Sequence, residues 1–448
     1  MPTPTDLVTD LPADFEVFGQ AVDTSLADLK GGTTGQVLSK NSNTDMDFVW
    51  VTDAAGDITG VTAGTGISGG GTSGTVTITN SMATEITAKG DLIVGTGSAT
   101  FDNLAAGSNG STLVADSAAT TGLRYSATPS ASNPIINSSM QNWQRGTSIA
   151  CSSTAYTADR WQGYRTVAGA TVSRQTTSDT TNLPFIQYAA RVQRDSANTS
   201  TTAIFFAQSL ESVNSIPFIG KVVTVSFYAR SGANYSSASS ALSVITATGT
   251  GTDQNVLTSY TGANNFISQT ATLTTTWQRF SYSGTVPSTG TELGTYFYYT
   301  PVGTAGAADY FEVTGVQIDV GSVALPFRTY AATIQGELAA CQRYYIRMGG
   351  TAAFEYLGAI GNAGATTNAD VMFVNIVPMR TTPSAIEYSL LSLYDGVAIP
   401  DCTAISALYS SPKTQFVRAS ASSLTQYRNY QLIARNSTSA YLAFSAEL

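Results

Sequence analysis

Apolar residues change their spacing along the chain, and the first regular pattern is helical. From residue 12 to residue 32 they recur at steps of three and four, with a proline near the start and a glycine pair at the end. The pattern predicts an amphipathic helix that is too short to be stable alone in water. We expect its apolar stripe to anchor the chain on another protein or on copies of itself, and packing on the following domain is the alternative. The stripe consists of Phe15, Phe18, Val22, Leu26 and Leu29.

The segment from 31 to 130 is rich in glycine, serine and threonine and repeats one module. GTTGQVLSKNSNTDMDFVW at 32–50 matches GSNGSTLVADSAATTGLRY at 107–125 at a constant offset. Each copy predicts a small hairpin that ends in an aromatic residue, Trp50 or Tyr125. So few large apolar side chains cannot form a core within one chain, which predicts a thin shaft of intertwined copies. A disordered linker is the alternative, although linkers do not repeat such a signature.

Beyond residue 130 the apolar residues alternate, which is the pattern of β-strands. KVVTVSFYAR at 221–230 alternates cleanly, and 276–286 and 310–321 predict two further strands. In the last of these the apolar parity changes across Gly315, which predicts a β-bulge. Short strands separated by Gly, Ser, Asn and Pro turns indicate an antiparallel sandwich.

The remaining chain returns briefly to helical spacing and then to strands. Ile334, Leu338, Cys341 and Tyr345 predict a short linking helix. The sequence therefore predicts a mostly β fold with five parts. These are an N-terminal anchor helix (1–30), a thin intertwined β shaft (31–130), a jelly-roll sandwich (131–330), a linking helix (331–348) and a second, smaller C-terminal β domain (349–448).

Composition excludes several classes of function. The net charge is −9, only 11% of residues are charged and there is no run of Lys or Arg, so we expect no nucleic-acid partner. No apolar run is long enough to span a bilayer, so we expect no membrane insertion. The first residues do not combine a basic segment with an apolar core, so we expect no secretion by a signal peptide. The chain has no histidine, which removes the histidine-dependent nucleophile systems and metal sites. Three distant cysteines do not form a disulfide framework, and we expect reduced thiols.

Several phrases, taken in order, resemble a known family. NPIINSSMQNWQRGTS, YTADRWQ, TWQRFSYSGTV, VTGVQIDVGSVALPFR and ELAACQRYY look like the distal domains of bacteriophage tail fibres and minor tail proteins. FEVTGVQIDVGSVALPFR is also similar to jelly-roll carbohydrate-binding modules, and the glycine-rich phrases look like fibre shafts. The resemblance implies a virion fibre, usually a homotrimer, that binds the host surface through its C-terminal part. We expect a host-surface glycan or wall polymer as the ligand, attachment to other tail proteins through residues 1–30, and synthesis in the host cytoplasm.

This resemblance implies no enzyme activity and no cofactor, and two alternatives stay open. One is a purely structural fibre, such as a head fibre or tail spacer, without receptor recognition. The other is a glycan-degrading spike, which needs two carboxylates about 5 to 9 Å apart. The acidic residues that could supply such a pair are Glu211, Glu292, Asp309 and Glu312. We expect no metal, although a calcium ion on Asp309 or Asp319 has the right ligand chemistry.

Aromatic residues are the candidate ligand contacts. Trp143, Arg145, Asp159, Arg160 and Trp161 gather in one stretch. They could form a sugar platform, but we favour a structural role, with both tryptophans in the core and Asp159 paired with one of the arginines.

A second aromatic run extends from 294 to 303. In it Tyr296 and Tyr298 share one face of a strand, and Phe297 and Tyr299 share the other. One face should be core and the other could stack on a glycan or line a subunit contact. The candidate ligand-binding residues are Tyr296, Tyr298, Trp161 and Tyr164.

Overall fold

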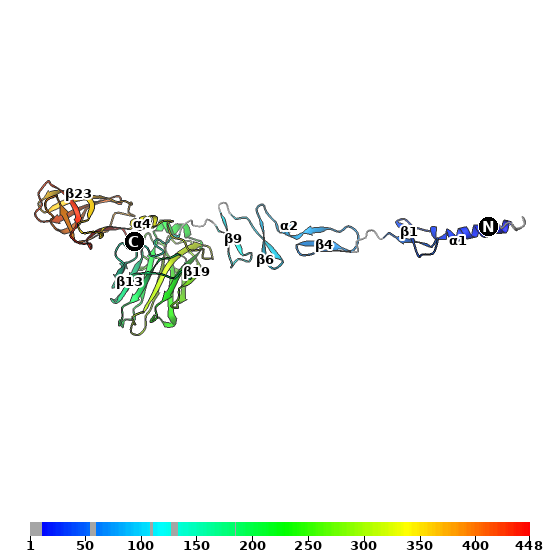
Figure 1. Cartoon of the computed structure of the whole chain (residues 1–448), viewed down its shortest axis with the longest axis horizontal. Coiled ribbons are helices and arrows are strands. Elements are labelled where there is room, and N and C mark those ends of the chain that lie inside the picture. Colours follow the sequence, from blue (N-terminus) through cyan, green and yellow to red (C-terminus); the bar gives the residue numbers. More distant parts are fainter. Residues whose placement is uncertain (1–10, 54–59, 108–110, 127–132, 184) are drawn as a thin grey trace. The chain divides into compact units, whose positions relative to one another are not determined.

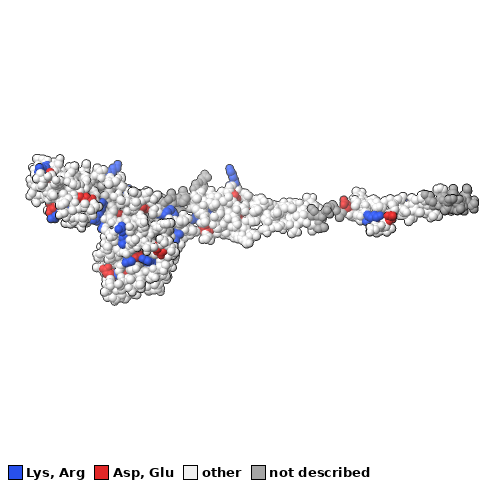
Figure 2. Space-filling view, viewed as in Figure 1, with Lys and Arg blue, Asp and Glu red and all other residues white. Residues whose placement is uncertain are grey.

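The computed structural model is mostly β, with antiparallel sheets and a short N-terminal helix, as predicted (Figure 1). It describes residues 11–53, 60–107, 111–126, 133–183 and 185–448. The chain divides into two compact units, Met1–Ala106 and Gly107–Leu448, and we describe each by itself. Most of the surface visible in Figure 2 carries neither basic nor acidic side chains, in keeping with the low charged fraction.

The first unit begins with the predicted helix. Helix α1 covers Leu11–Ser25 and a 3-10 turn, η1, covers Ala27–Leu29, while the first ten residues of the predicted anchor segment lie outside the described residues. The five side chains of the apolar stripe are all exposed by more than a third of their surface. The stripe therefore has no partner within the described part of this unit.

Short hairpins follow the helix in the first unit. None of the residues whose exposure the structure describes in this unit is buried, so the described part of the unit has no core of its own. Its elements are β1 (Gln36–Lys40), β2 (Phe48–Thr52), β3 (Val61–Thr62), β4 (Ile67–Gly71), β5 (Ile78–Asn80), α2 (Ser81–Glu85), β6 (Leu92–Gly97) and β7 (Thr100–Leu104).

The two sequence repeats form the same hairpin. In the first copy β1 pairs with β2 and Leu38 lies opposite Trp50. The second copy, β8 (Thr112–Ala115) and β9 (Leu123–Ser126), places Leu113 opposite Tyr125. A Cβ atom on Gly32 would lie 2.5 Å from the Trp50 ring, and one on Gly107 would lie 2.5 Å from the Tyr125 ring. Each repeat therefore needs glycine where its closing aromatic ring packs.

Two six-stranded antiparallel sheets form a jelly-roll sandwich in the second unit. The first sheet has the order β10 (Ser148–Ala150), β13 (Ala170–Thr176), β14 (Tyr188–Arg194), β21 (Tyr310–Val320), β16 (Val222–Ser231), β19 (Gln278–Thr285). The second has the order β11 (Ala155–Tyr156), β12 (Gln162–Tyr164), β15 (Ile204–Ser209), β20 (Glu292–Tyr299), β17 (Ala241–Gly249), β18 (Asn264–Thr272). Short helical turns α3 (Ser212–Ser215), η2 (Ile216–Phe218) and η3 (Ala238–Ser240) connect strands.

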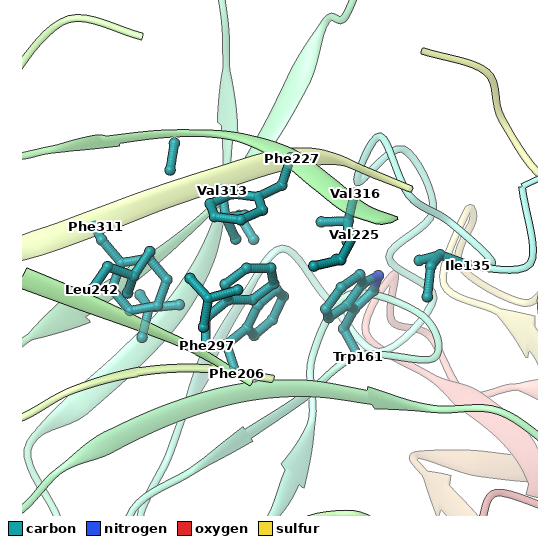
Figure 3. Packing of buried hydrophobic residues seen from close by; sticks show 14 of the residues in the cluster. Ile135, Trp161, Phe206, Val225, Phe227, Leu242, Phe297, Phe311, Val313 and Val316 are labelled. Carbon is teal, nitrogen blue, oxygen red and sulfur yellow. The ribbon is translucent and has the colours of Figure 1, made fainter. Parts of the chain in front are cut away.

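Aromatic rings fill the space between these two sheets (Figure 3). Trp161 is fully buried and stacks on Phe206 at 4.7 Å between ring centroids, and Phe297 meets Phe227 edge-on at 4.8 Å. The indole Nε1 of Trp161 donates a hydrogen bond to the carbonyl oxygen of Asn137 at 3.2 Å. This satisfied donor is what allows a tryptophan to be buried completely.

The predicted β-bulge at Gly315 is confirmed. Ser226 of β16 pairs with Gln317, but Tyr228 pairs with Thr314, so β21 holds one extra residue between these pairs. Gly315 itself has a φ of +61°, in the left-handed region that favours glycine. The bulge lets apolar side chains on both sides of it face the core.

A smaller β domain follows helix α4 (Ile334–Gln342). Its six-stranded sheet has the order β26 (Leu391–Tyr394), β29 (Asn429–Ala434), β23 (Tyr356–Ala365), β24 (Asn368–Val374), β28 (Thr414–Ala421), β27 (Cys402–Ser410). The facing three-stranded sheet has the order β22 (Tyr345–Gly349), β30 (Tyr441–Ser445), β25 (Ala385–Ser389). A separate apolar core lies between the two sheets.

Buried polar groups join the two β domains of the second unit. Glu447 pairs with Arg160, and with Arg145 at 3.2 Å between Oε1 and Nη1. The predicted pairing of Asp159 with one of these arginines is therefore wrong, because a carboxylate some 300 positions further along the chain takes both. Asp159 instead accepts hydrogen bonds from the backbone and side-chain nitrogens of Gln144, both at 2.9 Å.

Candidate functional site

Four aromatic side chains lie together on the outer face of the second sheet of the first sandwich. Tyr164 of β12 pairs with Phe205 of β15, which in turn pairs with Tyr298 of β20. Tyr296 precedes Tyr298 by two residues, so it points to the same face of its strand. We call these four residues the aromatic platform, and each of them is partly exposed.

Strand alternation determines which rings reach solvent. Phe206 and Phe297, which alternate with the platform residues, are fully buried on the inner face. A ligand on the platform would therefore rest on a sheet whose opposite face is packed core, which keeps the rings in place without a ligand. Pre-organised aromatic surface of this kind binds without the entropy cost of ordering side chains.

The platform rings are spaced closely enough to form one surface. Ring centroids lie 5.7 Å apart for Tyr164 and Phe205, and 5.0 Å apart for Phe205 and Tyr298, whose planes differ by only 23°. Tyr296 adds a fourth ring, 6.2 Å from Tyr298 and 6.3 Å from Phe205. Adjacent rings at this separation can stack on successive pyranose units of an extended glycan, whose axial C–H groups form apolar faces.

Polar but uncharged groups extend the row beyond the rings. Tyr298 pairs with Ser243 of β17, and Ser243 pairs with Thr270 of β18, so two hydroxyl-bearing residues continue the line. Burial is the main cause that raises the pKa of Tyr296, followed by the neighbouring Tyr298, while a hydrogen bond with Asn265 opposes the shift. The Tyr296 hydroxyl therefore stays protonated near neutral pH and can donate a hydrogen bond.

A loop limits the platform along the strands. Val256 and Tyr260, from the β17–β18 connection, bury Ala207, Ile245 and Ala247 on this outer face. Tyr296 and Tyr298 pack against this cluster, so the loop covers the part of the face next to the platform. The partly exposed rings lie across the three neighbouring strands β12, β15 and β20, an arrangement that suits an extended polymer more than a small molecule.

The predicted candidates separate into two groups. Tyr164, Tyr296 and Tyr298 come together on the platform, whereas Trp161 lies in the core and is not available to a ligand. Assigning Trp161 to ligand binding was therefore wrong, and the structural interpretation of its cluster holds for it. Phe205 was missed because it lies in the run IFFA, where both faces of the strand are apolar and alternation gives no signal.

The acidic residues that could serve a hydrolytic spike are buried and engaged. Glu211 binds Arg343 at 2.8 Å and Tyr344, and Glu312 binds both Arg191 and Arg230. Asp309 faces Arg194 at 3.3 Å, and Oε2 of Glu292 accepts from the backbone of the 250–256 loop. None of these four carboxylates is a platform residue.

The possible calcium ligands also face cations. Asp319 pairs with Arg328 at 2.7 Å, in the same way that Asp309 pairs with its arginine. Within the described residues, no group of three or more acidic or cysteine side chains could hold a metal ion. A calcium site at Asp309 or Asp319 is therefore not supported.

No helix in the described part of the chain is both long and apolar enough to cross a membrane.

Comparisons with known proteins give weak likenesses only. No family model and no curated protein matches the chain. Similar solved structures include a CBM4 module (17% identity, 41% of this chain and 98% of that one, TM-score 0.27) and TmCBM61 in complex with β-1,4-galactotriose (10%, 36% and 88%, TM-score 0.23). Another is the enzymatically active domain of bacteriophage CBA120 tailspike protein 4 (13% identity, TM-score 0.26), where the match covers 42% of this chain and 21% of that one. At these TM-scores the likenesses assign neither family nor function.

Proposed function

We propose that this chain is a fibre protein of a bacteriophage virion that attaches to a host-surface glycan through the aromatic platform. The aromatic platform is the observation that carries the binding part of the proposal: four partly exposed rings on one rigid, uncharged strip. The virion part rests on the sequence resemblance to tail fibres and on the glycine-rich repeats. The protein binds without cleaving its ligand, a view supported by the engagement of the candidate carboxylates in ion pairs and hydrogen bonds.

Platform variants of the full chain test this function on host cells and on isolated wall polysaccharide. Phe205→Ala and Tyr298→Ala should each weaken binding by roughly 1 to 3 kcal/mol, the scale of a lost anchor contact, and leave the melting temperature nearly unchanged. Phe185→Ala is the matched control, because its ring is fully exposed on the β13–β14 loop of the same sandwich and away from the platform strands.

The result also separates this proposal from a purely structural fibre. A chain that joins virions but binds neither cells nor polysaccharide would support the structural alternative. Loss of binding in Phe185→Ala with none in Tyr298→Ala would move the site away from the platform. Release of soluble sugar from the polysaccharide by the purified chain would show that the protein is an enzyme.

A further inference from the structure

A second aromatic hollow lies in the C-terminal β domain, on the outer face of its six-stranded sheet. It has a volume of about 180 Å³. Ile433 of β29 is buried and forms the floor, while the neighbouring strands β23 and β26 provide the walls. We call this the C-terminal hollow, and its lining residues are Phe354, Tyr356, Tyr394, Ile399 and Ile433.

The walls of the hollow meet nearly at right angles. The rings of Tyr356 and Tyr394 are 6.3 Å apart with planes inclined by 70°. Both residues lie beside the floor because Tyr356 and Ser392, two residues before Tyr394, each pair with Ile433. A ligand ring that enters the hollow can therefore stack on one tyrosine and touch the edge of the other.

Hydrogen bonds hold both wall loops in place. On one side, Glu355 accepts hydrogen bonds from the backbone nitrogens of Thr351 and Ala352, and its own carbonyl accepts one from Ala434 of β29 at 2.8 Å. On the other side, Asp395 accepts from the backbone nitrogens of the two residues at 397 and 398. The hollow is thus formed before any ligand arrives.

Polar groups flank the hollow along the floor strand. Gln431 pairs with Tyr394 and precedes Ile433 by two residues, so its amide is on the same face. On the other side of the floor, Arg435 pairs with Asp401 at 2.6 Å, and these two side chains are 51% and 43% exposed. An amide and an accessible guanidinium–carboxylate pair offer donors and acceptors to neighbouring hydroxyl groups.

We propose that the C-terminal hollow is a second carbohydrate site, which takes a single pyranose unit of a glycan. A pyranose has an apolar C–H face for the tyrosine rings and hydroxyl groups for Gln431 and the Arg435–Asp401 pair. An aliphatic side chain of a protein partner would use the rings but would leave these polar groups without counterparts. The proposal goes beyond the aromatic platform and does not require the platform to bind.

The test uses the full chain with the platform weakened by Tyr298→Ala, so that a further loss of binding on adding a substitution in the C-terminal hollow reports that hollow. The probes are the methyl β-glycosides of glucose, galactose and N-acetylglucosamine, titrated by saturation-transfer NMR. We expect at least one glycoside to bind, and binding to fall at least tenfold when Tyr394→Ala is added. Tyr409→Ala added to the same background is the control, because Tyr409 is 80% exposed on β27 and outside the hollow. Its addition should change nothing.

Three results would overturn the proposal. The first is that the Tyr298→Ala chain binds none of the three glycosides. The second is that Tyr394→Ala and Tyr409→Ala reduce glycoside binding equally. The third is that Ile399→Asp changes the oligomeric state while no glycoside binds. The last would show that a partner's side chain occupies the hollow. Failure of the platform proposal looks different, since Tyr298→Ala would then bind polysaccharide as the unmodified chain does.

Discussion

At the scale of single residues, the environment of Asp159 shows how burial and charge compete. Burial is the largest influence and raises its pKa from 3.8 to about 6, against hydrogen bonds from Gln144 and the nearby charge of Arg145. The negative charge of Glu447, which pairs with Arg145, also raises the pKa of Asp159, but by less than burial does. This carboxyl group therefore takes up a proton more readily in the folded chain than in the unfolded one.

The raised pKa predicts a pH dependence of stability. Because the folded state holds the proton more tightly, the stabilisation is present below about pH 4 and is lost as the pH rises to about 6. Relative to Asp159→Asn, the free energy of unfolding of the native chain should fall by about 1 to 3 kcal/mol across this window. Urea titrations of both chains at a series of pH values measure the difference. Parallel pH profiles for the two chains would contradict the assignment.

Strand alternation is the part of the site that the sequence could predict. It placed Tyr296 and Tyr298 on one face and Phe297 and Tyr299 on the other, and the latter two are buried. Alternation does not show which strands are neighbours. It therefore could not predict that Phe205 belongs to the aromatic platform, nor could it predict the C-terminal hollow. Both depend on sheet order, which is set by the packing of the whole domain.

Other features were predictable because they are local. The hairpin repeats need only their glycines and closing rings, and the bulge at Gly315 follows from a change of parity within one strand. By contrast, Glu447 pairs with Arg145 and Arg160 across about 300 positions, and no local sequence pattern predicts such a partner.

Within strand β21, the bulge predicts the effect of one substitution. A Cβ atom at Gly315 would lie 2.8 Å from Tyr228 and 2.9 Å from Ile186, and the residue has a positive φ. Gly315→Ala should lower the free energy of unfolding by about 2 to 4 kcal/mol, because backbone strain and crowding add. Gly303→Ala is the control, since Gly303 shares the φ of +61° but has no atom within 4 Å of the added Cβ. Equal losses in thermal unfolding would mean that crowding contributes nothing.

At the scale of the whole molecule, the two units differ in how much of their apolar surface they bury. The second unit contains separate buried cores in its two sandwiches, whereas the described part of the first unit buries no residue. Its apolar side chains include Ile67, Ile78 and Ile86, each about half exposed. A soluble single chain rarely leaves so much of its apolar surface in water.

This contrast predicts self-association, and we propose a homotrimer. Copies that pack along the first unit would cover its apolar residues and the stripe of α1. Light scattering of the full chain at micromolar concentration should give three times the chain mass of 46.7 kDa. A chain that begins at residue 107 should associate more weakly. A monomer at this concentration would contradict the proposal.

The proposed binding of a glycan to the aromatic platform has one more consequence, which concerns its dependence on salt. The row from Tyr164 through Phe205 and Tyr298 to Ser243 and Thr270 contains no charged side chain. Dissolved salt weakens attraction between charges but leaves contacts between rings and sugar faces intact or slightly stronger. A fibre that binds a neutral glycan in this way would bind its host equally well at low and at high salt concentration.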